Sequence, residues 1–194
     1  MAEFATLVCW GVVVVVWVVG AALAARGSRA RAQAGFGSGV LWRIGSVVAA
    51  GLVYRFGRHE LHRVTDHSPW IELAGLVLLI ASTAFTIWAR FTLGRLWSAS
   101  PNALRADHEL RTDGPYSITR HPIYTGLFGM VLGSVLLNGL GSSLAFLLVA
   151  AVVVATRIPI EERLMDKTFP DEYASYRERV PRFVPGLRQL RRLH

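Results

Sequence analysis

The chain alternates long apolar blocks with short segments that are rich in arginine. The block that begins the chain contains Val12 to Val19 without a single charge. A helix needs roughly 20 apolar residues to cross the hydrocarbon core of a bilayer. Blocks close to this length occupy 4–25, 40–57, 70–89, 122–138 and 142–158. The pattern therefore predicts an all-α integral membrane protein with about five transmembrane helices.

The ends of these blocks support the same interpretation. Glu3 precedes the first block and its arginines follow it, whereas a signal peptide has a basic start, so we expect a retained span. Arg43 lies near one end of the second block, where a long side chain can reach the headgroups. The run Asn138-Gly139-Leu140-Gly141-Ser142 predicts a tight turn between the last two helices.

Arginine placement predicts the orientation of the chain. Five spans would put segments 26–39, 90–121 and 159–194 on one side, and most arginines lie in these segments. The positive-inside rule then places the N-terminus outside and the C-terminus in the cytoplasm. We expect residues 1–89 to form three transmembrane helices, and residues 90–194 to form a cofactor-binding and catalytic region.

Composition narrows the choice of partners. The chain has 53% hydrophobic residues, a mean hydropathy of +0.40 and a formal charge of +8 from 20 Arg, one Lys and 13 acids. The arginines accompany apolar blocks, which favours contact with membrane lipids over nucleic acid. No obligatory protein partner is evident, and the preference for arginine suggests a GC-rich genome and a bacterial inner membrane. The lone Cys9 excludes an intrachain disulfide, and His59, His62 and His67 fit a polar loop better than a metal site.

The first candidate constellation lies before the fourth block. Asp113-Gly114-Pro115 predicts a turn, and Pro122 suits the first turn of a helix. Arg120 and His121 would then lie at a helix N-terminus, where free N–H groups attract a carboxylate or phosphate. The alternative is that Arg120 anchors the helix to lipid headgroups.

The second constellation follows the fifth block. Pro159 should kink or end that helix, and the adjacent carboxylates Glu161 and Glu162 come directly after it. In a functional site, Glu161 accepts hydrogen bonds from a ligand amine or hydroxyl while Arg157 meets an anion. The alternative is a solvated helix start with an i,i+4 pair between Arg157 and Glu161.

The third constellation is the segment 169–186. Tyr173, Tyr176 and Val180 fall on one helical face and charges on the other. This pattern predicts a C-terminal amphipathic helix that lies on the cytoplasmic membrane surface and caps the site.

Taken together, the three constellations resemble the isoprenylcysteine carboxyl methyltransferase family and the related phospholipid methyltransferases. The similar region runs from about Arg90 to Gly186, and its most specific parts are Arg-His-Pro-x-Tyr at 120–124 and the Glu-Glu pair. The resemblance implies that S-adenosylmethionine binds in a cytosolic pocket, with Arg157 and Arg90 contacting the substrate. It assigns cofactor contacts to His108, Glu109, Leu110, Arg111, Tyr116, His121, Pro122, Ile123, Tyr124 and Glu161. The chain departs from eukaryotic members at Arg111 and Asp113, where they have valine and serine.

The resemblance thus implies an S-adenosylmethionine-dependent methyltransferase that acts on a lipid or another lipophilic substrate. No well-isolated base is apparent, which favours a carboxylate or thiolate acceptor over an amine. Prenylated cysteine, phosphatidylethanolamine and small lipophilic acids or thiols all remain open as acceptors. Two other readings stay open: a membrane sterol-reductase-like oxidoreductase that uses NADPH, and a non-catalytic scaffold that binds anionic lipid.

Overall fold

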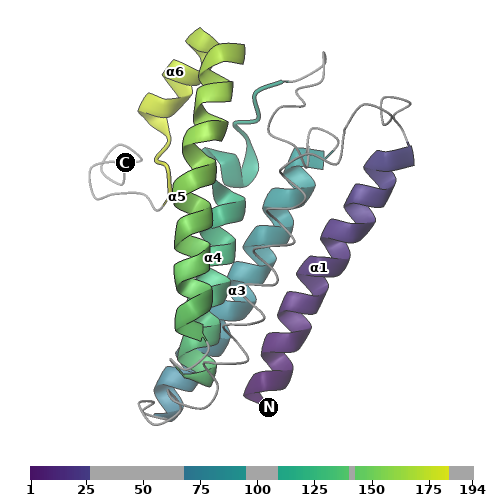
Figure 1. Cartoon of the computed structure of the whole chain (residues 1–194), viewed down its shortest axis with the longest axis vertical. Coiled ribbons are helices and arrows are strands. Elements are labelled where there is room, and N and C mark those ends of the chain that lie inside the picture. The colour runs from purple at the N-terminus through teal and green to yellow at the C-terminus, as the bar shows by residue number, and fades with distance from the viewer. Residues whose placement is uncertain (27–67, 95–108, 140–142, 184–194) are drawn as a thin grey trace. The chain divides into compact units, whose positions relative to one another are not determined.

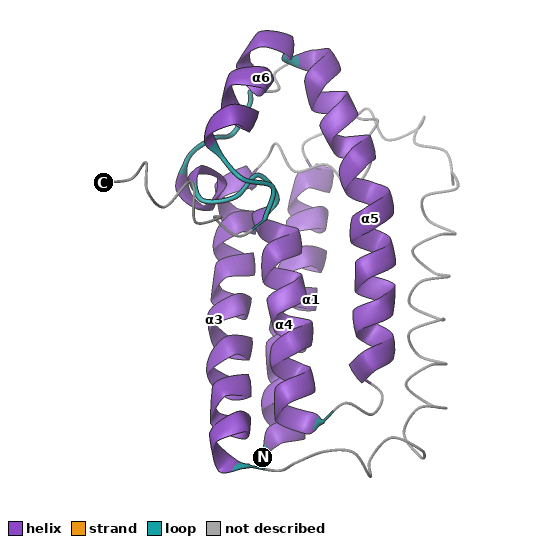
Figure 2. Cartoon of the chain, turned by 90° about the vertical axis from the view of Figure 1, so that its left-hand side faces the viewer, coloured by secondary structure: helices purple, strands orange, loops and turns teal. Residues whose placement is uncertain are grey.

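The computed structural model describes residues 1–26, 68–94, 109–139 and 143–183, and every regular element in these ranges is helical (Figures 1 and 2). The elements are α1 (Ala2–Arg26), α3 (Pro69–Leu93), the short 3-10 helix η4 (Gly114–Ser117), α4 (Pro122–Asn138), α5 (Ser143–Thr168) and α6 (Pro170–Arg179). The predicted all-α fold is confirmed for this part of the chain. The predicted span 40–57 and the histidines at 59, 62 and 67 lie outside the described residues.

The helices α1, α3 and α4 match three of the predicted spans. Within the described ranges, Ala2–Gly20 and Pro69–Leu93 are long and apolar enough to cross a membrane, and α4 is a shorter apolar helix. On α1, Val14, Val15 and Val18 are exposed. Exposed valines are unfavourable in water and suit contact with hydrocarbon chains.

The helix α5 excludes one of the two outcomes predicted at Pro159, an end to the helix. It runs through Pro159 and continues to Thr168, so the helix does not end at the proline. Proline removes one backbone hydrogen bond and crowds the preceding turn, at a cost of about 3 kcal/mol. Side chains on both sides of Pro159 offset this cost, because Ile158 and Glu162 are buried. As a result Arg157, Glu161 and Glu162 are carried by one continuous helix.

The chain divides into two compact units. The first consists of residues 1–81 and 128–152, and α3 and α4 approach closely within it. A Cβ at Gly133 would lie 2.7 Å from the Leu79 backbone nitrogen, and one at Gly75 would lie 2.7 Å from the Leu137 nitrogen. The missing side chains of Gly75 and Gly133 therefore allow α3 and α4 to pack closely.

Neutral hydrogen bonds join α1 to α4 in the same unit. The Trp10 indole Nε1 donates to Ser134 Oγ at 3.2 Å. The Asn138 amide Nδ2 donates to Thr6 Oγ1 at 2.7 Å. Both contacts satisfy polar groups that would otherwise be stranded in an apolar surrounding.

The second unit consists of residues 82–127 and 153–194. Here Gly126 of α4 packs against α3, where an added Cβ would collide with Thr86 Oγ1. Thr86 is fully buried and donates to the Ser82 carbonyl at 2.7 Å. The helix α6 buries one face, formed by Tyr173, Tyr176 and Val180.

Candidate active site

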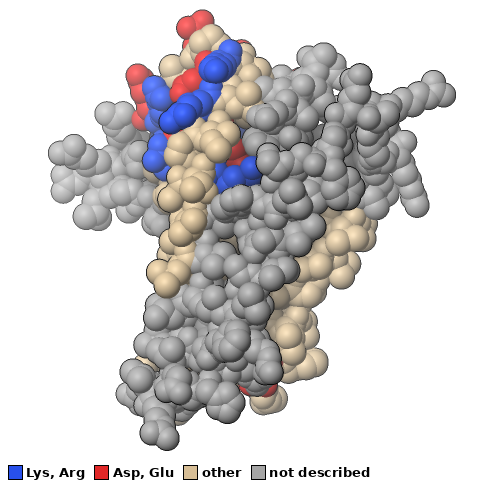
Figure 3. All heavy atoms as spheres, viewed as in Figure 1, with Lys and Arg blue, Asp and Glu red and all other residues tan. Residues whose placement is uncertain are grey.

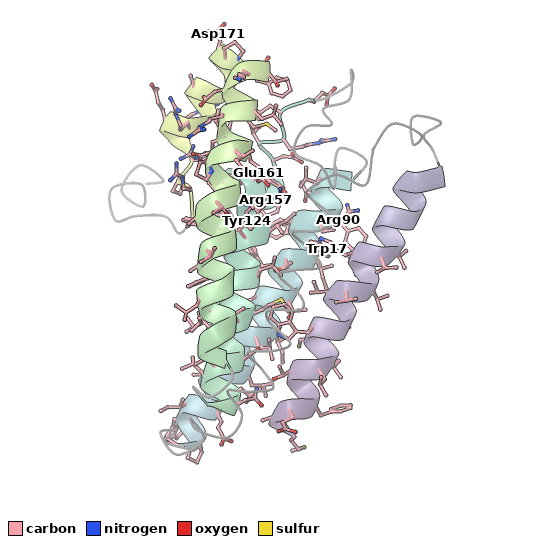
Figure 4. The ribbon with its side chains drawn as sticks, in the orientation of Figure 1. Trp17, Arg90, Tyr124, Arg157, Glu161 and Asp171 are labelled. Carbon is pink, nitrogen blue, oxygen red and sulfur yellow. The ribbon has the colours of Figure 1, made fainter. Side chains whose placement is uncertain are left out.

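Two helices of the second unit supply the predicted site residues. Pro122 begins α4, so Arg120 and His121 precede the helix and Tyr124 lies in its first turn. On α5, Arg157 and Glu161 are one turn apart and share a face. Figure 4 shows the Tyr124, Arg157 and Glu161 labels next to one another, and a hydrogen bond joins the two helices here.

Glu161 is the centre of this group. The Tyr124 hydroxyl donates to Glu161 Oε1 at 2.6 Å, and the glutamate side chain remains 30% exposed. Burial raises the pKa of the Glu161 carboxyl, while the Tyr124 hydrogen bond and the positive charge of Arg157 oppose the rise. Glu161 Oε2 is 3.9 Å from His121 Nδ1, which is too far for a hydrogen bond. One carboxylate oxygen is thus held by Tyr124 and the other faces the histidine.

His121 is buried and its other ring nitrogen contacts a different carboxylate. Nε2 lies 3.2 Å from Glu162 Oε1. Burial lowers the pKa of His121 to about 4, helped by the charges of Arg120 and Arg182 and opposed by Glu162. The imidazole is therefore neutral near pH 7.

Glu162 was not among the predicted site residues, but its side chain lies at the centre of a cluster of charged groups. Glu162 is 7% exposed, and its carboxylate contacts two arginines in addition to His121. Arg120 Nη1 forms an ion pair with Oε1 at 2.9 Å, and Arg182 contacts both oxygens, with its Nε 3.2 Å from Oε1. Burial alone would raise the pKa of Glu162, but the Arg182 hydrogen bonds and the Arg120 charge outweigh it and lower the pKa. Glu162 is consequently an ionised, buried carboxylate.

This arrangement changes the interpretation of Arg120. Its side chain is 9% exposed and paired with Glu162, so neither a free anion site nor a headgroup anchor describes it. The sequence predicted that a carboxylate would bind next to Arg120 at the start of α4, and the carboxylate found there is that of Glu162. Figure 3 shows basic and acidic side chains gathered at the end of the molecule where α5 and α6 lie. Arg177 and Asp166, both exposed, form an ion pair at 3.4 Å.

The segment after α6 pairs with the residues that lead into α4. The Tyr176 hydroxyl donates to the Tyr116 carbonyl at 2.6 Å. The Arg120 amide donates to the Pro181 carbonyl at 2.8 Å, and Thr119 Oγ1 donates to the Arg182 carbonyl at 2.8 Å. Hydrogen bonds to backbone carbonyls, together with the contacts of Glu162, therefore hold the segment after α6 against the residues that precede α4.

Tyr116 lies in the same region as Glu161. Burial raises the pKa of the Tyr116 hydroxyl, the charges of Tyr176 and Glu161 add to the rise, and Arg90 opposes it. Arg90 is buried at the end of α3 and its Nη1 donates to the Gly94 carbonyl at 3.2 Å. The charges of Glu161 and Arg90 therefore both act on the Tyr116 hydroxyl, in opposite directions.

The remaining predicted residues differ in their surroundings. Leu110 packs against the Tyr173, Tyr176 and Val180 cluster, and Pro122 is fully buried, so both contribute packing. Arg111 lies 4.0 Å from Asp113, and its buried Nε has no hydrogen-bond partner among the described residues. Glu109 is exposed, Ile123 is half-buried, and His108 lies outside the described residues.

Together, these side chains can bind a ligand that carries one positive and one negative group. Glu161 Oε2 and the neutral His121 offer two acceptors, which suit an ammonium or hydroxyl group. Arg157 and the partly exposed Arg111 offer cations for a carboxylate. Tyr116 and Tyr124 offer aromatic surface. The structure thus brings Tyr116, His121, Tyr124, Arg157 and Glu161 into one region.

Comparison with known proteins gives three related findings. The phospholipid methyltransferase family model matches residues 70–172, which is more than half of the chain. "Protein-S-isoprenylcysteine O-methyltransferase B" of Arabidopsis thaliana is 36% identical over 118 residues, covering 60% of each chain. The "Nickel-cobalt-cadmium resistance protein NccN" of Alcaligenes xylosoxydans xylosoxydans is 33% identical over 130 residues, covering 64% of this chain and 58% of that protein.

A solved structure shares the fold. The eukaryotic intramembrane Ras methyltransferase ICMT (isoprenylcysteine carboxyl methyltransferase) superposes with a TM-score of 0.62 at 21% identity, covering 93% of this chain and 67% of that one. The chain spans about 60% of the length of the curated relatives named above. The family match covers Arg90 and the grouped residues from Tyr116 to Glu161. The chain belongs to the phospholipid methyltransferase family.

Proposed function

We propose that the protein is an integral-membrane methyltransferase that uses S-adenosylmethionine to methylate a lipophilic substrate at the cytoplasmic membrane face. One observation carries the proposal: the hydrogen bond between Tyr124 and Glu161 joins the two motifs of the family match, which are 37 residues apart. This bond brings the acceptor and the cation of α5 next to the residues that begin α4.

The side chains fit the chemical groups of this cofactor. Glu161 Oε2 beside His121 suits its ammonium group. The buried Nε of Arg111, which has no hydrogen-bond partner in the described part of the chain, suits its carboxylate. Tyr116 and Tyr124 suit the adenine ring. When bound, S-adenosylmethionine supplies a methyl group on a positively charged sulfur.

The substrate side of the site favours an acceptor that is already anionic. His121 has a pKa of about 4, so it is a weak base near pH 7 and is poorly matched to removing a proton from an amine. A carboxylate needs no base, only a cation to orient it, and Arg157 is placed on the same face of α5 as Glu161. Arg90, buried beside Tyr116, is a second candidate. An isoprenylcysteine-like carboxylate is therefore the preferred substrate class, and positioning would provide most of the rate enhancement.

The proposal includes a membrane arrangement. Five transmembrane helices would place the N-terminus outside and the C-terminus in the cytoplasm of a bacterial inner membrane. The exposed valines of α1 and the apolar lengths of α3 and α4 support this arrangement. In the same arrangement α6 is an amphipathic helix that caps the site, because it buries its tyrosines and exposes Arg177 and Arg179.

Cofactor binding by detergent-purified protein tests the proposal. We expect saturable binding of S-adenosylhomocysteine by calorimetry, weakened roughly a hundredfold by Glu161→Gln, because a half-buried charged partner is lost. The matched control Glu178→Gln removes an exposed carboxylate on α6 and should bind like the wild type.

The other outcomes identify the alternatives. Preferential binding of NADPH would support a reductase, and binding of neither nucleotide would support a lipid-binding scaffold. A labelled-methyl assay with a farnesylcysteine carboxylate and with phosphatidylethanolamine then separates the acceptor classes. Labelling of phosphatidylethanolamine alone would overturn the preference for a carboxylate.

A further inference from the structure

We propose that Glu162 is a positioning residue that acts through His121: it fixes the imidazole as the tautomer protonated on Nε2 and keeps Nδ1 as an acceptor beside Glu161. The use of that acceptor for the cofactor rests on the proposed function. The tautomer itself does not, because it is a property of the ligand-free protein.

The geometry determines which ring nitrogen carries the hydrogen. Nε2 of His121 lies 3.2 Å from Glu162 Oε1, within hydrogen-bond distance. An ionised carboxylate can only accept, so the nitrogen that faces it must donate. The hydrogen therefore lies on Nε2, and Nδ1 of the neutral ring carries a lone pair.

The surrounding charges oppose a second proton on the ring. Arg120 and Arg182 both contact Glu162, so two positive charges face one carboxylate next to a buried imidazole. Glu161 lies on the other side of the ring, with its Oε2 3.9 Å from Nδ1, and the Tyr124 ring centroid is 6.0 Å from that of His121. The low pKa of His121 agrees with this balance of charge and burial.

The two adjacent glutamates thereby have different tasks. Glu161 is partly exposed and can touch a ligand, whereas Glu162 is enclosed by Arg120, His121 and Arg182. Neighbouring residues on a helix point about 100° apart, and the two carboxylates accordingly face different nitrogens of the His121 ring. The lone pair on His121 and the free oxygen of Glu161 form a pair of acceptors that can share one ammonium group.

A purely structural role for Glu162 is the alternative. Through Arg182 it also holds the segment after α6, where Thr119 and Arg120 bond to the carbonyls of Arg182 and Pro181. Loss of Glu162 would then lower stability and cofactor affinity without any special relation to His121. A test must distinguish action through His121 from a general loosening of the segment.

The first experiment measures the tautomer in ligand-free protein. Nitrogen NMR of the detergent-solubilised chain, labelled on its histidines, reports which ring nitrogen is protonated, and His121→Gln assigns the signal. We expect a neutral ring protonated on Nε2 at pH 7. A ring protonated on Nδ1, or a charged ring, would overturn the proposal whether or not the protein binds S-adenosylmethionine.

The second experiment is a double-mutant cycle of Glu162→Gln and His121→Gln, read out as S-adenosylhomocysteine affinity. By analogy with the partners of metal-ligating histidines, whose removal weakens binding roughly ten- to a hundredfold, loss of Glu162 should weaken binding by a similar factor. The double variant should bind no more weakly than His121→Gln alone, because both changes remove the same contact. Additive losses would show that Glu162 acts independently of His121. If Glu162→Gln fails to fold, the tautomer measurement on the wild type still decides.

Discussion

The contacts within one compact unit differ in kind from the contacts within the other. In the first unit, α3 and α4 approach at Gly75 and Gly133, and neutral hydrogen bonds from Trp10 and Asn138 join α1 to α4. In the second unit, helices and loops meet at the buried carboxylate of Glu162. Backbone packing and neutral hydrogen bonds suffice to assemble apolar helices.

This difference between the two units indicates where a functional site lowers the stability of the fold. A buried ion pair is often no more stabilising than apolar residues of the same volume, because removing charges from water is expensive. The cluster around Glu162 is therefore better explained by its control of His121 than by stability. Substitutions in the two units should therefore change stability by different amounts and respond differently to pH.

The largest expected effect is a pH dependence that comes from the second unit. The pKa of His121 is about 4 in the folded chain and about 6.5 in the unfolded chain. Because the unfolded chain takes up the proton first, stability is lost as the pH falls from 6.5 towards 4, by about 3 kcal/mol. Thermal unfolding in detergent across this range should show the loss in the wild type and not in His121→Gln. Parallel curves would contradict the assigned environment of His121.

The helix contacts of the first unit should tolerate an added methyl group least. In Gly133→Ala the new Cβ meets the Leu79 backbone, which cannot rotate away. We expect a loss of about 2 kcal/mol after the gain in helix propensity. In Gly126→Ala it meets the Thr86 hydroxyl, a side-chain atom that can turn, so the loss should be smaller. Denaturant midpoints of the two variants test the order, and the reverse order would contradict it.

Two arginines of the second unit allow an ion pair with a buried carboxylate to be compared with an ion pair on the surface. Arg182→Ala removes a contact with the buried Glu162, and we expect a loss of about 1–2 kcal/mol. Arg177→Ala removes an exposed contact with Asp166, 3.4 Å away, and should cost less than about 1 kcal/mol. Melting temperatures in low and high salt provide the measurement. Equal losses for the two variants would show that burial of Glu162 adds nothing.

The smallest effect should come from the neutral hydrogen bonds of the first unit. Asn138→Ala removes the 2.7 Å bond to Thr6 Oγ1, and such bonds between membrane helices average about 0.6 kcal/mol. Thr6→Val removes the same bond from the other side and should cost a similar amount. A loss several times larger, measured by unfolding in detergent, would mean that polar contacts dominate this unit too.

Local signals in the sequence predicted much of the fold. Pro122 and the Asn138-Gly139 pair marked both ends of α4, and the structure places Gly139 at a φ of +88°, a conformation that glycine adopts readily. Tyr173 and Tyr176 were assigned to one helical face, and both are buried. These features depend on neighbours along the chain, which a sequence displays directly.

The role of Glu162 depends on distant partners and could not be predicted in the same way. Arg120 precedes it by 42 residues and Arg182 follows it by 20, and nothing local indicates that they meet. The sequence analysis singled out Glu161 of the adjacent pair, but nothing local indicated that Glu162 would be enclosed by two arginines and His121. Pro159 alone did not reveal whether α5 would end there, and the helix continues to Thr168.

Because α5 is continuous through Pro159, the number of residues between Ile158 and Glu161 determines which way the side chains after them point. One residue inserted between Ile158 and Glu161 would turn everything after it by about 100°. The carboxylate that now meets Tyr124 would swing away, and its neighbour would leave its two arginines. Shortening or lengthening this stretch by one residue should therefore be far more damaging than any single replacement within it, so the spacing of α5 is itself part of the site.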